Sequence, residues 1–420
     1  MALTAVAWCI VGVRGHILHE PFPRNTLFWM PEYRFTDFTE ESLRAEHFGM
    51  PHVLTRTDLG QMSADPFPYP PPTIYAYLAF VAFPRPLVAY LIFVLLSFFA
   101  ATCYFSWRVK RAAPGHLPQL AIWSTFLMGF PLAFLIDRGN IEGVIWVLIL
   151  LGLFAFTRNR MVLAVLLWGL AASMKIYPGL LFVLFLAKRK YRIFALAIAA
   201  TAAFTVLALA GIGPTVGQAA ADSAHSQPFL LRDFILVRHT PGFDHSLFGA
   251  IKQIMRGYIS LHTRQFGLDT RPAFGKALRV YNILIPLCAL LLYWFRLRRF
   301  PLLNQFMAYM LLCVILPYIS YEYTLINIYL VWGAFLLFLL SDVATGRISI
   351  PARAIHTILI SCAVIFVPLS YLLIGNNPEH MIAFGGQVQL VFIAIILWTV
   401  LRTPMPSSLF GDLRSHPTAS

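Results

Sequence analysis

An acidic segment at residues 34–41 is the first place in the chain where side chains could do chemistry. Asp37 precedes Glu40 by three residues and is flanked by phenylalanines, at a point where we expect the chain to lie just outside a bilayer. Partial desolvation raises the pKa of such a carboxyl group, which suits it to take a proton from a hydroxyl. The same spacing also fits a helix N-cap with its reciprocal partner, so catalysis, capping or both are open.

A lone lysine and a charged connection could supply positive groups. Lys175 interrupts the apolar stretch 161–187, where a charge is costly unless it has a partner. A phosphate, or an acid of the connection 137–142, could be that partner. Arg138 and Asn140 belong to the same connection, which either faces a bundle interior or is a charge-balanced turn.

Three further residues stand in segments with weaker signals. Tyr69 lies in the proline-rich segment 65–72, which is rigid and extended and leads into an apolar stretch, 73–83, that is too short to span. His245 lies where the chain re-enters an apolar stretch, and Glu322 lies between tyrosines at an interface. Turns and interfacial anchoring are the more common explanations for such segments.

The composition requires a membrane around these residues. Of the 420 residues, 59% are hydrophobic and 12% are charged, whereas soluble domains average about 25% charged residues. Apolar runs of about 20 residues recur, which is the length needed to cross a bilayer. We predict an all-α polytopic membrane protein, a single transmembrane domain over 1–420 with about 10–12 segments. The expected spans are 2–18, 86–107, 118–136, 140–156, two short helices within 161–187 that turn near Lys175, 193–211, 278–295, 301–319, 324–340, 354–374 and 387–401.

The distribution of charge predicts the topology. With both termini in the cytoplasm, half of the 32 Lys and Arg residues but two of the 18 acidic residues are cytoplasmic, so the whole net charge of +14 lies on that side. Two long loops then face outward, 20–85 with a re-entrant half-helix and 212–277. The basic excess reflects topology and contact with anionic lipids of the plasma (inner) membrane, and we expect no nucleic-acid partner.

Several classes of chemistry lack their motifs. The chain has no P-loop, GxSxG, HExxH or GxGxxG motif, and its five cysteines form no CxxC or Cys/His cluster. ATP-driven transport, serine hydrolysis and zinc proteolysis are therefore unsupported, and we expect no metal site.

In their order and topology, these motifs resemble glycosyltransferase family 87, which comprises polyprenol-phosphate-dependent mannosyltransferases and relatives of the GT-C superfamily. The matching stretches are 67–71, 138–151 and 169–178, and 244–247 stands where the family has Asn-Gln-Ser-Leu. The resemblance covers about residues 20–335. Tyr-Glu-Tyr at 321–323 departs from the family, whose members often have a histidine there that can meet the donor phosphate.

The resemblance implies a GT-C-like bundle and an inverting transfer outside the membrane. A mannose-like hexose would pass from a polyprenyl-phosphate donor, the co-substrate in place of any cofactor, to a glycolipid or glycan acceptor of the cell envelope. Asp37 matches the general base, and Lys175 is the first candidate to hold the phosphate. The other expected substrate-binding residues are Tyr69, Arg138, Asn140, His245 and Glu322.

Two other functions compete with this one. A flippase or transporter of lipid-linked sugars predicts charges across the middle of the membrane, and few are present beyond Lys175. A non-catalytic scaffold in an envelope assembly predicts that replacement of Asp37 is tolerated.

Overall fold

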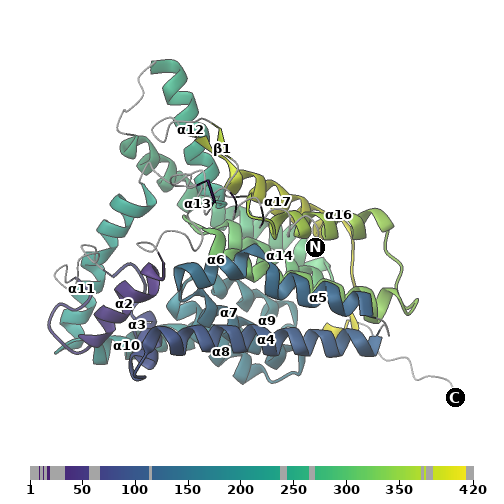
Figure 1. Ribbon diagram of the computed structural model, residues 1–420, viewed down its shortest axis with the longest axis horizontal. Helices are drawn as coiled ribbons and strands as arrows, with labels where there is room; N and C mark the ends of the chain where they lie inside the picture. Colours follow the sequence, from purple (N-terminus) through teal and green to yellow (C-terminus); the bar gives the residue numbers. More distant parts are fainter. Residues whose placement is uncertain are drawn as a thin grey trace.

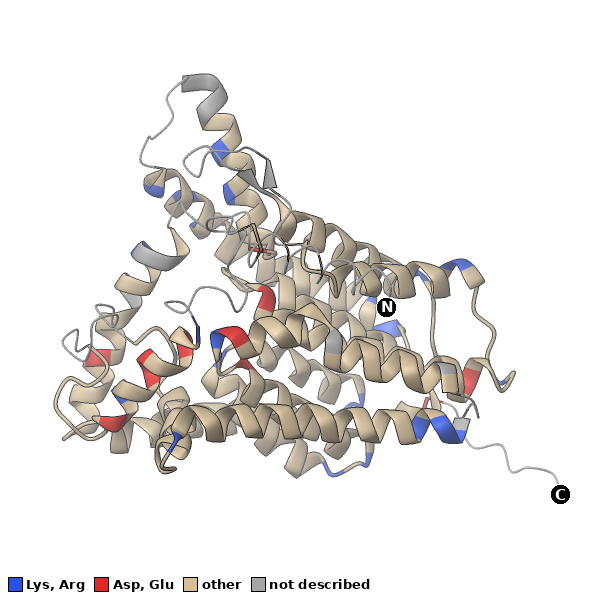
Figure 2. Ribbon diagram, viewed as in Figure 1, with Lys and Arg blue, Asp and Glu red and all other residues tan. Residues whose placement is uncertain are grey.

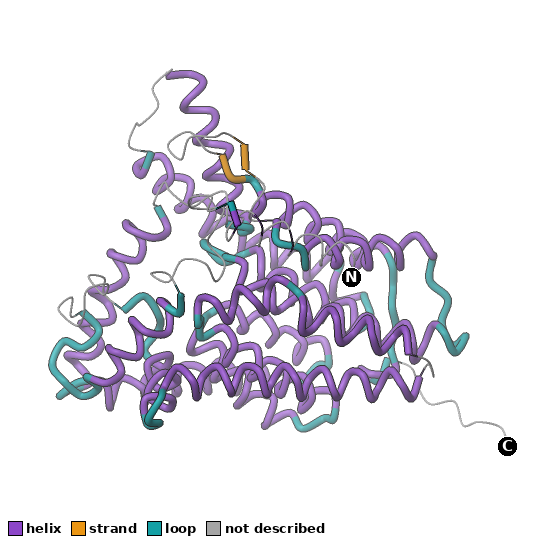
Figure 3. Tube along the Cα trace, viewed as in Figure 1, coloured by secondary structure: helices purple, strands orange, loops and turns teal. Residues whose placement is uncertain are grey.

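The computed structural model describes residues 9, 13, 17–18, 34–55, 67–112, 116–236, 244–263, 270–369, 373–374 and 382–412. Within these residues the chain is helical apart from its turns and one antiparallel pair of two-residue strands, β1 (Leu373–Ile374) and β2 (Ile382–Ala383), orange in Figure 3. The all-α prediction is therefore confirmed. The expected span 2–18 falls mostly outside the described residues, and Asp65 of the proline-rich segment lies outside them as well.

The helices follow one another along the chain as Figure 1 labels them. The α-helices are α2 (Thr36–Glu46), α3 (Pro72–Val81), α4 (Pro86–Ala112), α5 (His116–Met128), α6 (Phe130–Arg138), α7 (Glu142–Thr157), α8 (Met161–Met174), α9 (Val183–Ala187), α10 (Tyr191–Ile212), α11 (Val216–Phe229), α12 (Leu247–Thr263), α13 (Arg271–Phe295), α14 (Leu302–Ile315), α15 (Ile328–Phe338), α16 (Ala352–Ile365) and α17 (Gly385–Arg402). Short 3-10 or π segments are η3 (Tyr177–Phe182), η4 (Leu230–Ile235), η5 (Leu297–Arg299), η6 (Glu322–Asn327), η7 (Leu339–Val343) and η10 (Ser408–Phe410).

Many of these helices are built for a bilayer. Among the described residues, six helices are long and apolar enough to cross a membrane, and six shorter apolar helices have 10–17 residues. Only 11% of the apolar window of α10 is buried inside the protein, against 78% for the window that contains α15. Helix α15 is therefore central, whereas α10 keeps an apolar surface of the kind that faces lipid. The chain is a multi-pass membrane protein.

The stretch 161–187 is broken at the lysine, as predicted. Helix α8 ends at Met174, Lys175 is extended with φ −141° and ψ 135°, and η3 then begins with Pro178 in its first turn. Proline fits this position because its missing N–H would have no partner there. Thr73 at the start of α3 donates its hydroxyl to the Met174 carbonyl at 2.9 Å, which satisfies a group freed by the break. The short helix expected over 73–83 is therefore present as α3 and packs against the break.

The basic turns of the chain gather at one end of the bundle. Lys188, between α9 and α10, donates to Asn159 Oδ1 between α7 and α8 at 3.3 Å and interacts electrostatically with Asp412 near the C-terminus. Asp412 in turn accepts from the backbone N–H of Leu302, at the start of α14, at 3.1 Å. Most of the acidic residues that the structure describes lie at the other end, over α2, the α6–α7 junction and α11 (Figure 2). This separation of charge agrees with the basic clusters sharing one side of the membrane.

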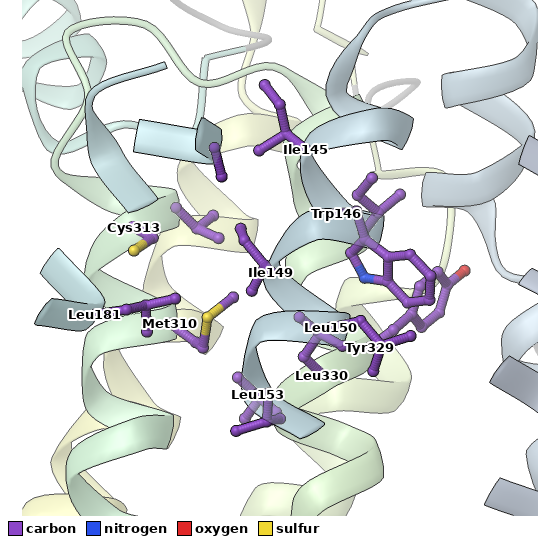
Figure 4. Close-up of a cluster of buried hydrophobic side chains, with 14 of the residues drawn as sticks. Ile145, Trp146, Ile149, Leu150, Leu153, Leu181, Met310, Cys313, Tyr329 and Leu330 are labelled. Atoms are coloured by element: carbon purple, nitrogen blue, oxygen red, sulfur yellow. The ribbon is translucent and has the colours of Figure 1, made fainter. Parts of the chain in front are cut away.

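Helix α7 contributes many side chains to the core of the bundle. Figure 4 shows its apolar side chains pointing to η3 and α14 on one side, toward Leu181 and Met310, and to Tyr329 of α15 on the other. Trp146 stacks on Phe98 of α4, with ring centroids 4.1 Å apart and planes 11° from parallel. These contacts hold the first residue of α7, and the turn before it, in one position.

Close packing of α7 against α8 depends on Gly152. A Cβ at this position would lie 2.3 Å from the indole Nε1 of Trp168, which donates to the Ile149 carbonyl at 3.1 Å. We predict that Gly152→Ala lowers the stability of the folded protein by about 1–3 kcal/mol, because Trp168 must leave its position. Thermal unfolding of the purified protein in detergent measures the effect. Gly217→Ala on α11, where a Cβ meets nothing within 4 Å, is the control, and equal midpoints for both variants would contradict this packing.

Candidate active site

The turn between α6 and α7 builds the site. Gly139 follows α6 with φ +66°, and its backbone N–H reaches back to the Leu135 carbonyl at 2.9 Å. A Cβ on Gly139 would lie 2.8 Å from Cβ of Phe38 on α2. Glycine is therefore required at position 139 for two reasons, the left-handed backbone and the close approach of α2. The tight turn brings the side chains of Arg138 and Asn140 to the same helix, α2.

Asp37 is held at this turn by two hydrogen bonds. Its Oδ1 accepts from the Arg138 guanidinium at 3.0 Å, and its Oδ2 accepts from Asn140 Nδ2 at 2.7 Å. The backbone N–H of Phe35 donates to the Asp137 carbonyl at 2.7 Å and fixes the start of α2. The N-cap of α2 is Phe35, and no side chain caps it, so the N-cap role considered for Asp37 is wrong. The carboxylate turns toward Arg138 and Asn140 because charge-assisted bonds to them are stronger than a cap.

Asn140 connects Asp37 to Lys175. Its Nδ2 also donates to the Tyr69 hydroxyl at 3.2 Å, and its Oδ1 accepts from the Glu142 N–H at 3.0 Å and from Lys175 Nζ at 3.4 Å. The Tyr90 hydroxyl donates to the backbone carbonyl of Asn140. Asn140 has no exposed surface. Asn140 lies behind the other side chains and orients them, and its predicted role in binding substrate stays a prediction.

Lys175 lies between a carboxylate and two aromatic rings. Its Nζ is 2.7 Å from Glu142 Oε2, 5.5 Å from the ring centroid of Tyr69 and 5.2 Å from that of Tyr323. Both distances fit cation–π contacts. The side chain of Lys175 keeps 15% of its surface exposed, whereas that of Glu142 keeps none. Lys175 is therefore the accessible member of the pair.

Tyr69 serves the cluster as a neutral hydroxyl. Burial, with the nearby charge of Asp37, raises the pKa of Tyr69 well above its usual value. Its ring lies edge-on to Phe67, with centroids 5.7 Å apart, which fixes the proline-rich entry to α3 beside Lys175.

The accessible groups of the cluster have complementary chemistry. Asp37 and Arg138 keep 18% and 27% of their side-chain surface exposed, and Lys175 keeps 15%. A carboxylate that can take a proton thus stands next to two cations that can stabilise a developing negative charge. In the described part of the chain, no group of three or more His, Cys, Asp or Glu side chains could hold a metal ion.

His245 belongs to a second polar network. Its Nε2 lies 2.9 Å from Ser320 Oγ and 3.0 Å from Thr324 Oγ1, and the side chain is fully buried. Burial lowers the pKa of His245 to about 3, so the imidazole is neutral. The neighbouring Asp244 accepts from the backbone N–H groups of Ser246 and Ser320, both at 2.9 Å. The structure does not bring His245 to Asp37, and the predicted role of His245 in binding substrate stays a prediction.

The short helix η6 connects the two networks. Thr324 of η6 contacts His245, while Asn327 of the same helix donates to Glu142 Oε1 at 2.8 Å. Glu322 is buried at the first position of η6, which packs against α6. Its role in binding substrate also stays a prediction.

Two residues of the cluster were missed by sequence reasoning. Tyr177 and Asn327 both donate to Glu142 Oε1. A signal existed for Asn327, which is a polar residue inside the predicted span 324–340 and therefore needs a partner. Glu142 itself was named only as one possible partner of Lys175.

The fold and the site together define a membrane protein with an acid and two cations joined at one end of a helical bundle. The chain matches the family model of Glycosyltransferase family 87 over residues 67–320, more than half of its length, and therefore belongs to this family. No curated protein and no solved structure matches it. The protein is thus a membrane glycosyltransferase. The match includes five of the predicted site residues, Tyr69, Arg138, Asn140, Lys175 and His245, and leaves Asp37 and Glu322 outside.

A buried acid on α2, the helix that carries Asp37, makes the stability of the fold sensitive to pH. Glu41 lies one turn after Asp37, with its Oε2 3.3 Å from Arg44 Nε, and Arg44 also donates to the Val53 carbonyl at 3.0 Å. Burial raises the pKa of Glu41 from 4.5 to about 8, although Arg44 opposes the shift. The unfolded chain therefore ionises Glu41 at lower pH than the folded chain, and stability is lost as pH rises from 4.5 toward 8.

We predict that Glu41→Gln removes this loss. Between pH 5 and pH 8 the unfolding midpoint of the wild type should fall more than that of the variant. The corresponding loss in the free energy of unfolding is at most about 1.4 kcal/mol per pH unit. The measurement is thermal unfolding in detergent across that range, with Glu46→Gln, an exposed acid on the same helix, as the control. Parallel pH curves for wild type and Glu41→Gln would disprove the assignment.

Proposed function

We propose that this glycosyltransferase transfers a mannose-like hexose from a polyprenyl-phosphate donor to a glycolipid or glycan acceptor of the cell envelope, with inversion at the anomeric carbon. The observation that carries the proposal is the joining of the accessible carboxylate of Asp37 to Arg138 directly and to Lys175 through Asn140. Membership of the family supplies the reaction class, and the cluster supplies the groups that the reaction needs.

Asp37 acts as the general base. A carboxylate has about four lone-pair sites, so Asp37 can accept a bond from an acceptor hydroxyl while it keeps those from Arg138 and Asn140. The hydroxyl oxygen attacks the anomeric carbon as its proton passes to Asp37, and the bond from that carbon to the phosphate oxygen breaks. The polyprenyl phosphate leaves with the bonding electron pair.

Lys175 and Arg138 stabilise the charge on the leaving phosphate. Preorganised cations are most effective where water is scarce, and both residues are partly buried. The chain's own cations face the departing oxygen in this proposal, so no cofactor is needed. The lipid-linked sugar is the co-substrate. Tyr69, beside Lys175, borders the site on the side of α3.

The charge distribution supports a site outside the cytoplasm. Basic residues concentrate on the cytoplasmic side of membrane proteins. The turn of Lys188 therefore marks the cytoplasmic end, and the Asp37 cluster at the acidic end of the bundle faces outward (Figure 2). We place the protein in the plasma (inner) membrane with both termini in the cytoplasm.

We predict that Asp37→Asn lowers sugar transfer by about 100-fold or more, because the amide keeps the shape of Asp37 but cannot take the proton. The assay follows labelled sugar from a polyprenyl-phosphate donor into native envelope acceptors, in membranes that contain equal amounts of each protein. Asp222→Asn is the matched control. Asp222 lies on α11, where its Oδ1 is 3.0 Å from Nδ1 of His52, and it makes no bond to the cluster among those described. Equal transfer by wild type and Asp37→Asn would rule out Asp37 as the base.

A further inference from the structure

Glu142 is the most enclosed charged residue of the cluster. Its Oε2 lies 2.7 Å from Lys175 Nζ, and its Oε1 accepts from Asn327 Nδ2 at 2.8 Å and from the Tyr177 hydroxyl. The side chain has no exposed surface. Glu142 therefore cannot touch a substrate, and whatever it does for the reaction must pass through Lys175.

The surroundings of Glu142 favour a negative charge and hold the side chain in place. It is the first residue of α7, where the positive end of the helix dipole favours a negative charge. Tyr177 and Asn327 occupy Oε1, which leaves Oε2 directed at the ammonium group. A buried pair of this kind adds little stability over an apolar pair of similar size, so a functional reason for it is needed.

The charges of the cluster suggest that reason. Arg138 is balanced by Asp37 and also interacts with Asp137, and Lys175 is balanced by Glu142. The joined groups thus hold no surplus of positive charge. A phosphodiester with a single negative charge can share the exposed side of Lys175 with Glu142. A diphosphate brings a second charge, which would lie unpaired near two carboxylates in a partly buried site, where charges interact strongly.

We propose that Glu142 is a positioning residue that orients Lys175 and restricts the site to donors with one phosphate charge. The inference rests on the function proposed above and adds to it the residue that sets the charge of the accepted donor. Glu142 acts by balancing the positive charge of Lys175, which a second phosphate would need as its partner.

The test is the donor preference of the purified full-length protein. The quantity is the ratio of kcat/KM for a polyprenyl-phosphate sugar to kcat/KM for the corresponding polyprenyl-diphosphate sugar. Glu142→Gln keeps the size of the side chain and an oxygen for Tyr177 and Asn327, and it removes one negative charge. We expect wild type to prefer the monophosphate, and Glu142→Gln to shift the ratio toward the diphosphate by on the order of tenfold. Glu142→Asp, which retains the charge, should retain the preference.

A structural control separates charge from packing. Tyr177→Phe removes one hydrogen bond to Glu142 and leaves the charge, so it should lower thermal stability without moving the donor ratio. A second readout needs no transfer, namely the binding of non-transferable sugar analogues of polyprenyl phosphate and polyprenyl diphosphate to each protein in nanodiscs. The affinity ratio should shift in the same direction for Glu142→Gln and stay at the wild-type value for Tyr177→Phe.

Each outcome decides one of the two claims. A wild-type protein that uses and binds both lipids equally, or a Glu142→Gln variant with the wild-type ratio in both readouts, overturns the inference and leaves the proposed function standing. If wild type transfers sugar from neither donor, the proposed function fails, and the binding ratios alone decide whether Glu142 selects for charge.

Discussion

The site depends on the hydrogen bonds that the side-chain amide of Asn140 makes. This amide is fully buried, and a buried amide must have partners for both its oxygen and its nitrogen. Its nitrogen bonds Asp37 and Tyr69, and its oxygen bonds Lys175 and the first N–H of α7. One amide thereby fixes the relative positions of α2, the entry to α3, the start of α7 and the break after α8. Because such networks are cooperative, we expect each of these elements to be sensitive to the others.

The features of the fold that surround this amide lower the stability of the protein. The chain interrupts an apolar helix at Lys175, holds a left-handed glycine at position 139 and buries the pair of Lys175 and Glu142. None of these features is a good source of stability, because irregular backbone and buried charges are both costly. The Thr73 hydroxyl on the Met174 carbonyl and the packing of Trp146 on Phe98 offset part of that cost. Features that cost stability are expected at the end of the bundle where chemistry takes place.

The sequence predicted features that depend on membrane physics more reliably than features that depend on contacts. A charge at Lys175 and proline at 178 made the broken helix predictable, and the short apolar stretch after the prolines made α3 predictable. The partners of Asp37 were not predictable, because Arg138 lies 101 residues away and only the folded bundle brings it near. The same holds for Asn327, which reaches Glu142 across 185 residues. The position of His245 was also beyond pattern reasoning, since Ser320 and Thr324 hold it in a separate network.

The central claim is that the donor phosphate binds at the cluster formed by Asp37, Asn140 and Lys175. The most direct test is a cryo-electron microscopy structure of the full-length protein in nanodiscs with a non-transferable polyprenyl-phosphate sugar analogue. The account predicts phosphate density within hydrogen-bond distance of Lys175 Nζ or Arg138, with the sugar facing Asp37. Phosphate bound at the other end of the bundle, among the basic turns near Lys188, would contradict it.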